Sequence, residues 1–219
     1  MKGNVFFYNG RNKVGNIVNY IRAGQMISRA YVAKIRNPKT PEQVLARARF
    51  TELTKLAKGL APALSIGFYG TADALVSGRN VFIKKNYRII SGDDPDDLSV
   101  GYDEMVVADG GGVNVEFGAA DFASPLKVKV SWSNPFAAVP SANSDDKVYI
   151  VVYCPGVGYS VMKEAGTRNS GGDPVEVDIP SFMQGQKVHV YGFVVGSKNN
   201  TGFENVPSKS NYIGFGIIS

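Results

Sequence analysis

Apolar and polar residues follow different patterns in the two parts of this chain. In the second half, apolar side chains recur at every second position in the segments 113–117, 126–132 and 175–179. This period of two is typical of strands with one buried face and one wet face. Two further stretches, Lys147 to Tyr153 and Val188 to Val195, are apolar almost throughout, which predicts central strands.

Turn-rich segments separate these strand candidates, and no helical period lies among them. A succession of short strands of this kind predicts an antiparallel β-sandwich of immunoglobulin or fibronectin type over residues 98–219. The chain has a single cysteine, Cys154, so the Cys–Trp–Cys pattern of antibody domains is missing. The likeness therefore concerns architecture only.

The first 35 residues predict a β-meander. Val5–Tyr8, Val14–Ile21 and Gln25–Val32 are rich in β-branched and aromatic residues and are three strand candidates. Asn9–Gly10 and Gly24 supply the turns between them, because these residues tolerate positive φ angles.

A helix is predicted to begin at Pro41. Thr40 offers a capping hydroxyl, proline is tolerated at the first helical position, and Gln43 occupies the capping-box position. The helix is expected to run to about Lys58, with Gly59 as a left-handed stop. Its apolar stripe consists of Ala46, Phe50, Leu53, Ala57 and Leu60. A second helix is expected over Thr71–Asn86, followed by a solvated joint at Ser91–Asp97 whose charge, glycine and proline disfavour regular structure.

These elements together predict an α+β protein of two domains. The first, residues 1–92, is expected to be a basic β-meander with one or two helices that acts as an anchoring domain. The second, residues 98–219, is expected to be the immunoglobulin-like sandwich.

Charge separates the same two parts. Residues 1–60 carry twelve Lys and Arg against Glu42 and Glu52, a net charge of +10, whereas residues 101–219 carry eight against twelve acidic residues, a net of −4. We expect a basic face that binds an acidic protein surface, including that of another copy, or the phosphates of nucleic acid. A solvated face with no specific partner is the alternative. The residues of this face are Arg22, Arg29, Lys34, Arg36, Arg47 and Arg49, with Tyr20 and Tyr31 between them.

Catalytic and metal-binding chemistry is sparse in the sequence. The only histidine, His189, alternates with valines and is expected on the wet face of its strand, and Cys154 is expected to be buried. Asp93–Asp97 lacks the glycine and terminal glutamate of a calcium loop. We therefore expect no enzymatic activity, no metal and no cofactor. No run approaches the roughly 20 apolar residues of a membrane span, and no signal peptide precedes the strands, so we expect no membrane partner.

Several blocks resemble a family of uncharacterised small proteins from Bacteroides-type bacteria and their phages, including crAss-like phages. The helix opening, Asn-Pro-Lys-Thr-x-x-Gln followed by Arg-x-Arg, is also similar to segments of phage structural proteins. The resemblance implies a virion component but no active site. The residues that carry it are Gly15, Val18, Tyr20, Gly24, Arg29, Asn37–Thr40, Gln43, Arg47–Phe50, Asp145–Val148 and Val188–Tyr191.

The leading hypothesis is a non-enzymatic structural protein of a phage particle, made in the host cytoplasm, such as a head–tail connector, tail or capsid-associated component. Its basic part would dock on neighbouring structural proteins or on other copies of the chain. One alternative is a sequence-independent nucleic-acid-binding protein, which would be cytoplasmic. Another is a carbohydrate or surface-binding adhesin that uses exposed aromatic residues such as Tyr159 and Phe203.

Overall fold

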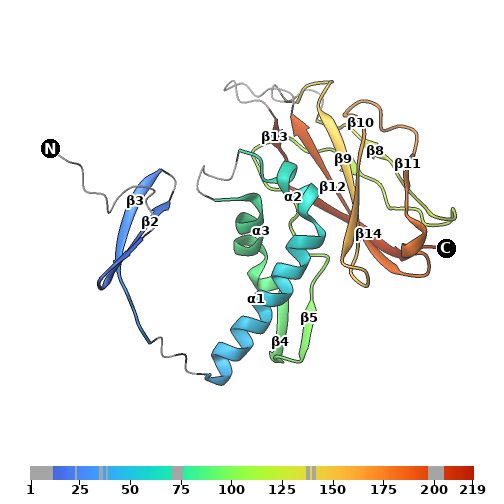
Figure 1. Ribbon diagram of the computed structural model, residues 1–219. Coiled ribbons are helices and arrows are strands. Elements are labelled where there is room, and N and C mark those ends of the chain that lie inside the picture. The colour runs from blue at the N-terminus through green and yellow to red at the C-terminus, as the bar shows by residue number, and fades with distance from the viewer. Residues whose placement is uncertain are drawn as a thin grey trace. The chain divides into compact units, whose positions relative to one another are not determined.

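The computed structural model describes residues 12–22, 24–34, 37, 39–70, 76–136, 139, 142–196 and 205–219 (Figure 1). The chain divides into two compact units, Met1–Gln43 and Val44–Ser219. We call them unit 1 and unit 2 and describe each by itself.

Unit 1 contains a three-stranded antiparallel sheet in the order β1–β2–β3. Its strands are β1 (Asn12–Val14), β2 (Ile17–Arg22) and β3 (Gln25–Ala30). Gly15 and Gly24 have φ angles of 57° and 77° in the two turns, a conformation that glycine adopts without strain. The strand predicted at 25–32 is confirmed in β3, whereas the strand predicted at 14–21 is divided by the turn at Gly15 into the end of β1 and most of β2. The candidates Val5–Tyr8 and Asn9–Gly10 lie outside the described residues.

Helix α1 (Pro41–Gly59) is confirmed, with its start at Pro41 as predicted and its end one residue beyond Lys58. The Thr40 hydroxyl accepts a hydrogen bond from the Gln43 amide at 3.4 Å, as the capping pattern predicts. The left-handed stop at Gly59 is wrong, because Gly59 is itself helical. Its missing side chain serves close packing instead, since a Cβ would lie 2.6 Å from the Gly158 carbonyl oxygen.

Two shorter helices follow, α2 (Ala61–Gly67) and α3 (Gly78–Asn86), and α3 continues into a 3₁₀ turn, Tyr87–Ile89. No element is predicted for residues 61–67, where the structure has α2. Pro62 lies in the first turn of this helix, where its missing N–H leaves no helical hydrogen bond unmade. The helix predicted over Thr71–Asn86 is described from Gly78 onward.

The main sheet of unit 2 is antiparallel, in the order β10–β9–β12–β14, with β13 also paired to β12. Its strands are β9 (Lys147–Cys154), β10 (Tyr159–Thr167), β12 (Lys187–Gly196), β13 (Val206–Pro207) and β14 (Asn211–Ile217). Three two-stranded pairs accompany it: β4 (Ile90–Asp94) with β5 (Asp97–Val100), β6 (Glu116–Phe117) with β8 (Trp132–Ser133), and β7 (Lys127–Val130) with β11 (Val175–Asp178). A 3₁₀ turn, Ser181–Met183, follows β11.

The central strands β9 and β12 are buried on both faces, as their continuous apolar sequences predict. One face packs against the helices, where Leu53, Leu60 and Phe82 meet Tyr191 and Phe193. Figure 1 shows α1, α2 and α3 on this side of the sheet, with β8 and β11 on the other.

The opposite face of the main sheet forms a second core with the shorter strand pairs. Val128, Val130 and Val177 of β7 and β11 pack there in one cluster with Ile150 and Val190 of the main sheet. Unit 2 is therefore built in three layers, helices, main sheet and a second layer of strands.

The α+β class and the antiparallel, β-rich C-terminal region are confirmed. The closer likeness to an immunoglobulin or fibronectin domain stays a prediction. The domain boundary differs from the expectation of 1–92 and 98–219, because the chain divides after Gln43. The segment expected to be a joint is the β4–β5 hairpin, and α1–α3 share a core with the sheet that follows it.

A buried ion pair joins four segments of unit 2. Arg168 and Asp146 are each 1% exposed, and the guanidinium Nη2 lies 3.0 Å from Asp146 Oδ2. The same guanidinium donates to the carbonyl oxygens of Val113 at 2.6 Å and Asn114 at 2.7 Å. The Arg168 carbonyl in turn accepts from the Trp132 indole at 3.1 Å. The two charges and the indole are buried, and the carbonyl groups of Val113 and Asn114, which are half-buried, complete the hydrogen bonds of the guanidinium.

Removing one partner of this pair is expected to destabilise unit 2 strongly. Arg168→Met leaves the Asp146 carboxylate buried without its counter-charge, a change that costs about 3–5 kcal/mol in unfolding free energy. Urea unfolding followed by Trp132 fluorescence measures it. Arg88→Met, at an exposed arginine, is the control and is expected to stay within about 0.5 kcal/mol of the wild type. Equal stabilities of the two variants would contradict the assignment.

Candidate functional site

One face of the sheet in unit 1 is aliphatic and exposed. The register places Ile17, Ile21 and Met26 on the same face, with exposures of 50%, 46% and 52%. The exception on this face is Asn19, which is buried and accepts a hydrogen bond from the Ser28 hydroxyl at 2.6 Å. Among the described residues of unit 1 no apolar side chain is fully buried, so this sheet has no dry core of its own. Such a sheet gains stability by covering its apolar face.

The other face of the same sheet combines cations with aromatic rings. The Arg29 guanidinium lies 5.9 Å from the centre of the Tyr20 ring, and Lys13 Nζ lies 3.5 Å from the centre of the Tyr31 ring. Cations at these distances are attracted by the electron-rich face of the ring. We call this surface, made of Lys13, Tyr20, Arg29 and Tyr31, the cationic face.

The structure brings together only part of the predicted basic set. Arg22, Arg29 and Lys34 belong to unit 1 and are exposed, whereas Arg47 and Arg49 belong to α1 in unit 2. The sixth predicted residue, Arg36, lies outside the described residues.

Arg49 has an internal role. It is half-buried, and its Nη2 donates to the Gly92 carbonyl oxygen at 2.8 Å, which ties α1 to the β4–β5 hairpin. Lys13, by contrast, was missing from the predicted set. The alternation of side chains along the strands on either side of the Gly15 turn could have shown that Lys13 lies on the same face as Tyr31.

The acidic hairpin β4–β5 is an exposed surface of opposite sign in unit 2. Its four aspartates are exposed, and the Asp94 carboxylate accepts a hydrogen bond from the Asp96 amide at 2.9 Å, which closes the turn. We call this surface the acidic tip, consisting of Asp93, Asp94, Asp96 and Asp97.

His189 is buried, which corrects the expectation of a wet position. It is 4% exposed, its ring stacks on Tyr102 with centroids 4.2 Å apart, and its Nδ1 lies 3.0 Å from the Tyr212 hydroxyl. Burial is the main cause that lowers the pKa of His189 to about 4. The ammonium of Lys187 acts in the same direction, and the carboxylate of Asp103 opposes both. His189 is thus a neutral packing residue near pH 7.

This shifted pKa predicts a loss of stability in mild acid. Between pH 6.5 and pH 4 the unfolded chain protonates His189 while the folded chain does not, so the unfolding free energy falls as pH falls through this window. From pH 7 to pH 5 the contribution is about 2 kcal/mol. Urea unfolding at both pH values measures it, with His189→Gln as the matched variant. The wild type is expected to lose more than His189→Gln, and equal losses would refute the prediction.

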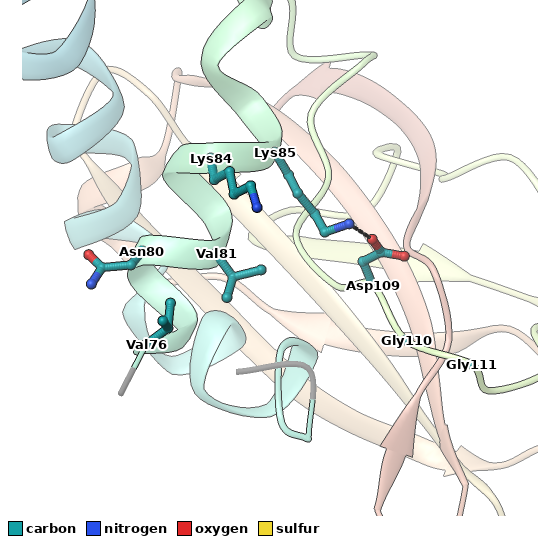
Figure 2. A pocket seen from close by; sticks show the side chains of 8 residues that line it. All are labelled: Val76, Asn80, Val81, Lys84, Lys85, Asp109, Gly110 and Gly111. Atoms are coloured by element: carbon teal, nitrogen blue, oxygen red, sulfur yellow. Dashed lines mark ion pairs between the residues drawn. The ribbon is translucent and has the colours of Figure 1, made fainter. Parts of the chain in front are cut away.

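A cavity with charged side chains in its lining lies between α3 and the segment 109–111 (Figure 2). Its volume is about 500 Å³. Lys85 forms an ion pair with Asp109 across it, and Lys84 extends from the preceding position of the helix. Apolar and glycine residues complete the lining, namely Val76 and Val81 on one side and Gly110 and Gly111 on the other, together with Asn80. No motif of the sequence pointed to this site.

The described residues include no metal-binding cluster and only one of the two aromatic residues of the adhesin hypothesis. Within the described ranges, no group of three or more His, Cys, Asp or Glu side chains is placed to hold a metal ion. Tyr159 is exposed and meets Phe182 edge-on at 5.4 Å, whereas Phe203, its companion in the adhesin hypothesis, lies outside the described residues. None of the described helices has the length and apolarity that crossing a membrane requires.

Fold and surfaces together define an α+β protein with a basic three-stranded unit followed by a helix-covered β-sheet unit. The chain belongs to a family of unknown function, DUF6266, whose model matches residues 8–214 and so spans parts of both units. No curated protein and no solved structure matches the chain.

Proposed function

We propose that this chain is a non-enzymatic structural protein that assembles with further copies of itself as a component of a phage particle. The basic unit 1 of one copy docks on the acidic tip of the next. The observation that carries the proposal is the exposure of both faces of the sheet in unit 1, one aliphatic and one cationic.

Charge complementarity supports a second copy as the occupant. Unit 1 carries eight Lys and Arg against one acidic residue, a net charge of +7, and unit 2 carries sixteen against eighteen, a net of −2. The four exposed aspartates of the acidic tip are the densest negative charge of unit 2. A contact between two different surfaces of identical chains is head-to-tail, and it generates rings or filaments of the kind from which particles are built. The phage context itself rests on the resemblance of the helix opening to phage structural proteins.

Assembly of this kind is expected to weaken when either charged surface is neutralised. The triple variant Arg22→Ala/Arg29→Ala/Lys34→Ala should raise the dissociation constant at least about tenfold at low salt, because it removes the attracting charges. Sedimentation velocity at about 50 mM and about 500 mM salt measures the mass of the assembly. Asp93→Asn/Asp97→Asn should have the same effect from the other side.

The control removes the same charge from exposed positions of unit 2, as Lys58→Ala/Arg79→Ala/Arg88→Ala. This variant is expected to assemble as the wild type does. A chain that stays monomeric at low salt, or a control that weakens assembly equally, would refute docking between copies. Mass spectrometry of purified particles tests the phage context separately, and absence of the chain from them would refute that part.

The cationic face favours a second candidate, binding of single-stranded nucleic acid without sequence preference. Lys13 and Arg29 stand over aromatic rings, so phosphates and bases would find charge and stacking surfaces together. Fluorescence anisotropy with a labelled single-stranded DNA is expected to show affinity that falls steeply with salt and is lost in the unit 1 triple variant. If DNA binds and also dissolves the assembly, the two activities share one face. If assembly persists in excess DNA, the DNA does not use the docking surface.

A further inference from the structure

We propose that the cavity between α3 and the segment 109–111 binds a small organic anion, with Lys84 as the residue that recognises its charge. This site lies wholly in unit 2 and does not depend on the proposed assembly. A volume of about 500 Å³ lies within the range of small-molecule sites, roughly 300–1,000 Å³.

The charges around the cavity favour an anion. Lys85 is already neutralised by its ion pair with Asp109. Lys84 has no carboxylate within ion-pair distance in the part of the chain that the structure describes. The two lysines and one aspartate therefore leave one positive charge, placed at Lys84. A lysine ammonium binds carboxylates and phosphates as a compact point charge.

The rest of the lining suits an apolar body attached to that charge. Val81 is partly buried against the helix-side core and offers an apolar wall, with Val76 beside it in the lining. Figure 2 shows Val81 on the same side of α3 as the two lysines. A ligand can therefore place an anionic group at Lys84 and an apolar group against valine.

The two glycines on the opposite side of the cavity differ in whether packing requires them. Gly110 is required by packing, because a Cβ there would lie 2.3 Å from the Pro207 carbonyl oxygen. Gly111 has no such reason, since a Cβ would meet nothing within 4 Å and its φ is not in the left-handed region. A side chain at Gly111 would therefore fit the fold. Its absence leaves the backbone accessible to a ligand.

The test uses the full chain and an amide-resolved NMR titration with phenyl phosphate, which joins an anion to an apolar ring. Shifts are expected at Val81, Lys84, Gly110 and Gly111, with a dissociation constant on the order of 1 mM at low salt. Lys84→Gln is expected to weaken binding roughly tenfold, and Lys84→Arg to restore most of it, because the positive charge is the recognising feature. Lys58→Gln removes the same charge from an exposed position of α1 and is expected to bind as the wild type does.

Two further probe compounds test separately which anionic group binds and whether the ring binds without a charge. Benzoate is expected to bind at the same amides if any organic anion suffices, and shifts with phenyl phosphate alone would restrict the class to phosphates. Benzyl alcohol, which has the ring without the charge, is expected to leave these amides unshifted. The proposal is overturned if benzyl alcohol binds as well as phenyl phosphate, if Lys58→Gln weakens binding as much as Lys84→Gln, or if the cavity amides do not respond to either anion.

Discussion

The architecture of unit 2 depends on one constraint, the two apolar faces of strands β9 and β12. Adjacent side chains of a strand point to opposite faces, so a strand that is apolar at nearly every position must be covered on both sides. The second layer of short strands covers one face, and the helices cover the other with Leu53, Leu60 and Phe82. The helices are for this reason part of the same unit as the sheet, although the acidic hairpin separates them in sequence.

The sequence predicted well those features that depend on neighbouring residues. The cap at Thr40 and Pro41 placed the start of α1, and the alternation of valines placed β7 and β11. Periodicity shows that a face is buried but not what buries it. His189 was expected in water because valines flank it, yet Tyr102, far away in the chain, covers its ring. The division of the chain after Gln43 likewise reflects contacts between segments that are distant in sequence.

The candidate functional surfaces, like the fold, could be predicted only in part from the sequence. The concentration of basic residues at the start of the chain is visible in a count of charges, but the count does not show which of them serve the fold. Arg49 is held by the Gly92 carbonyl, whereas Arg29 stands over an aromatic ring. The cavity beside α3 was beyond sequence reasoning altogether, because Lys84 and Gly111 belong to segments with no shared motif.

The Arg168–Asp146 pair has a consequence for how this family can change its sequence. Because the guanidinium also binds the carbonyl groups of Val113 and Asn114, loss of either charge would leave the other charge buried without its partner. Replacing only one of the two residues is therefore strongly destabilising. Replacing both by apolar residues leaves no buried charge, and only the two carbonyl oxygens lose their hydrogen-bond donor. Related chains should vary at the two positions together, which makes this pair a marker for aligning distant members.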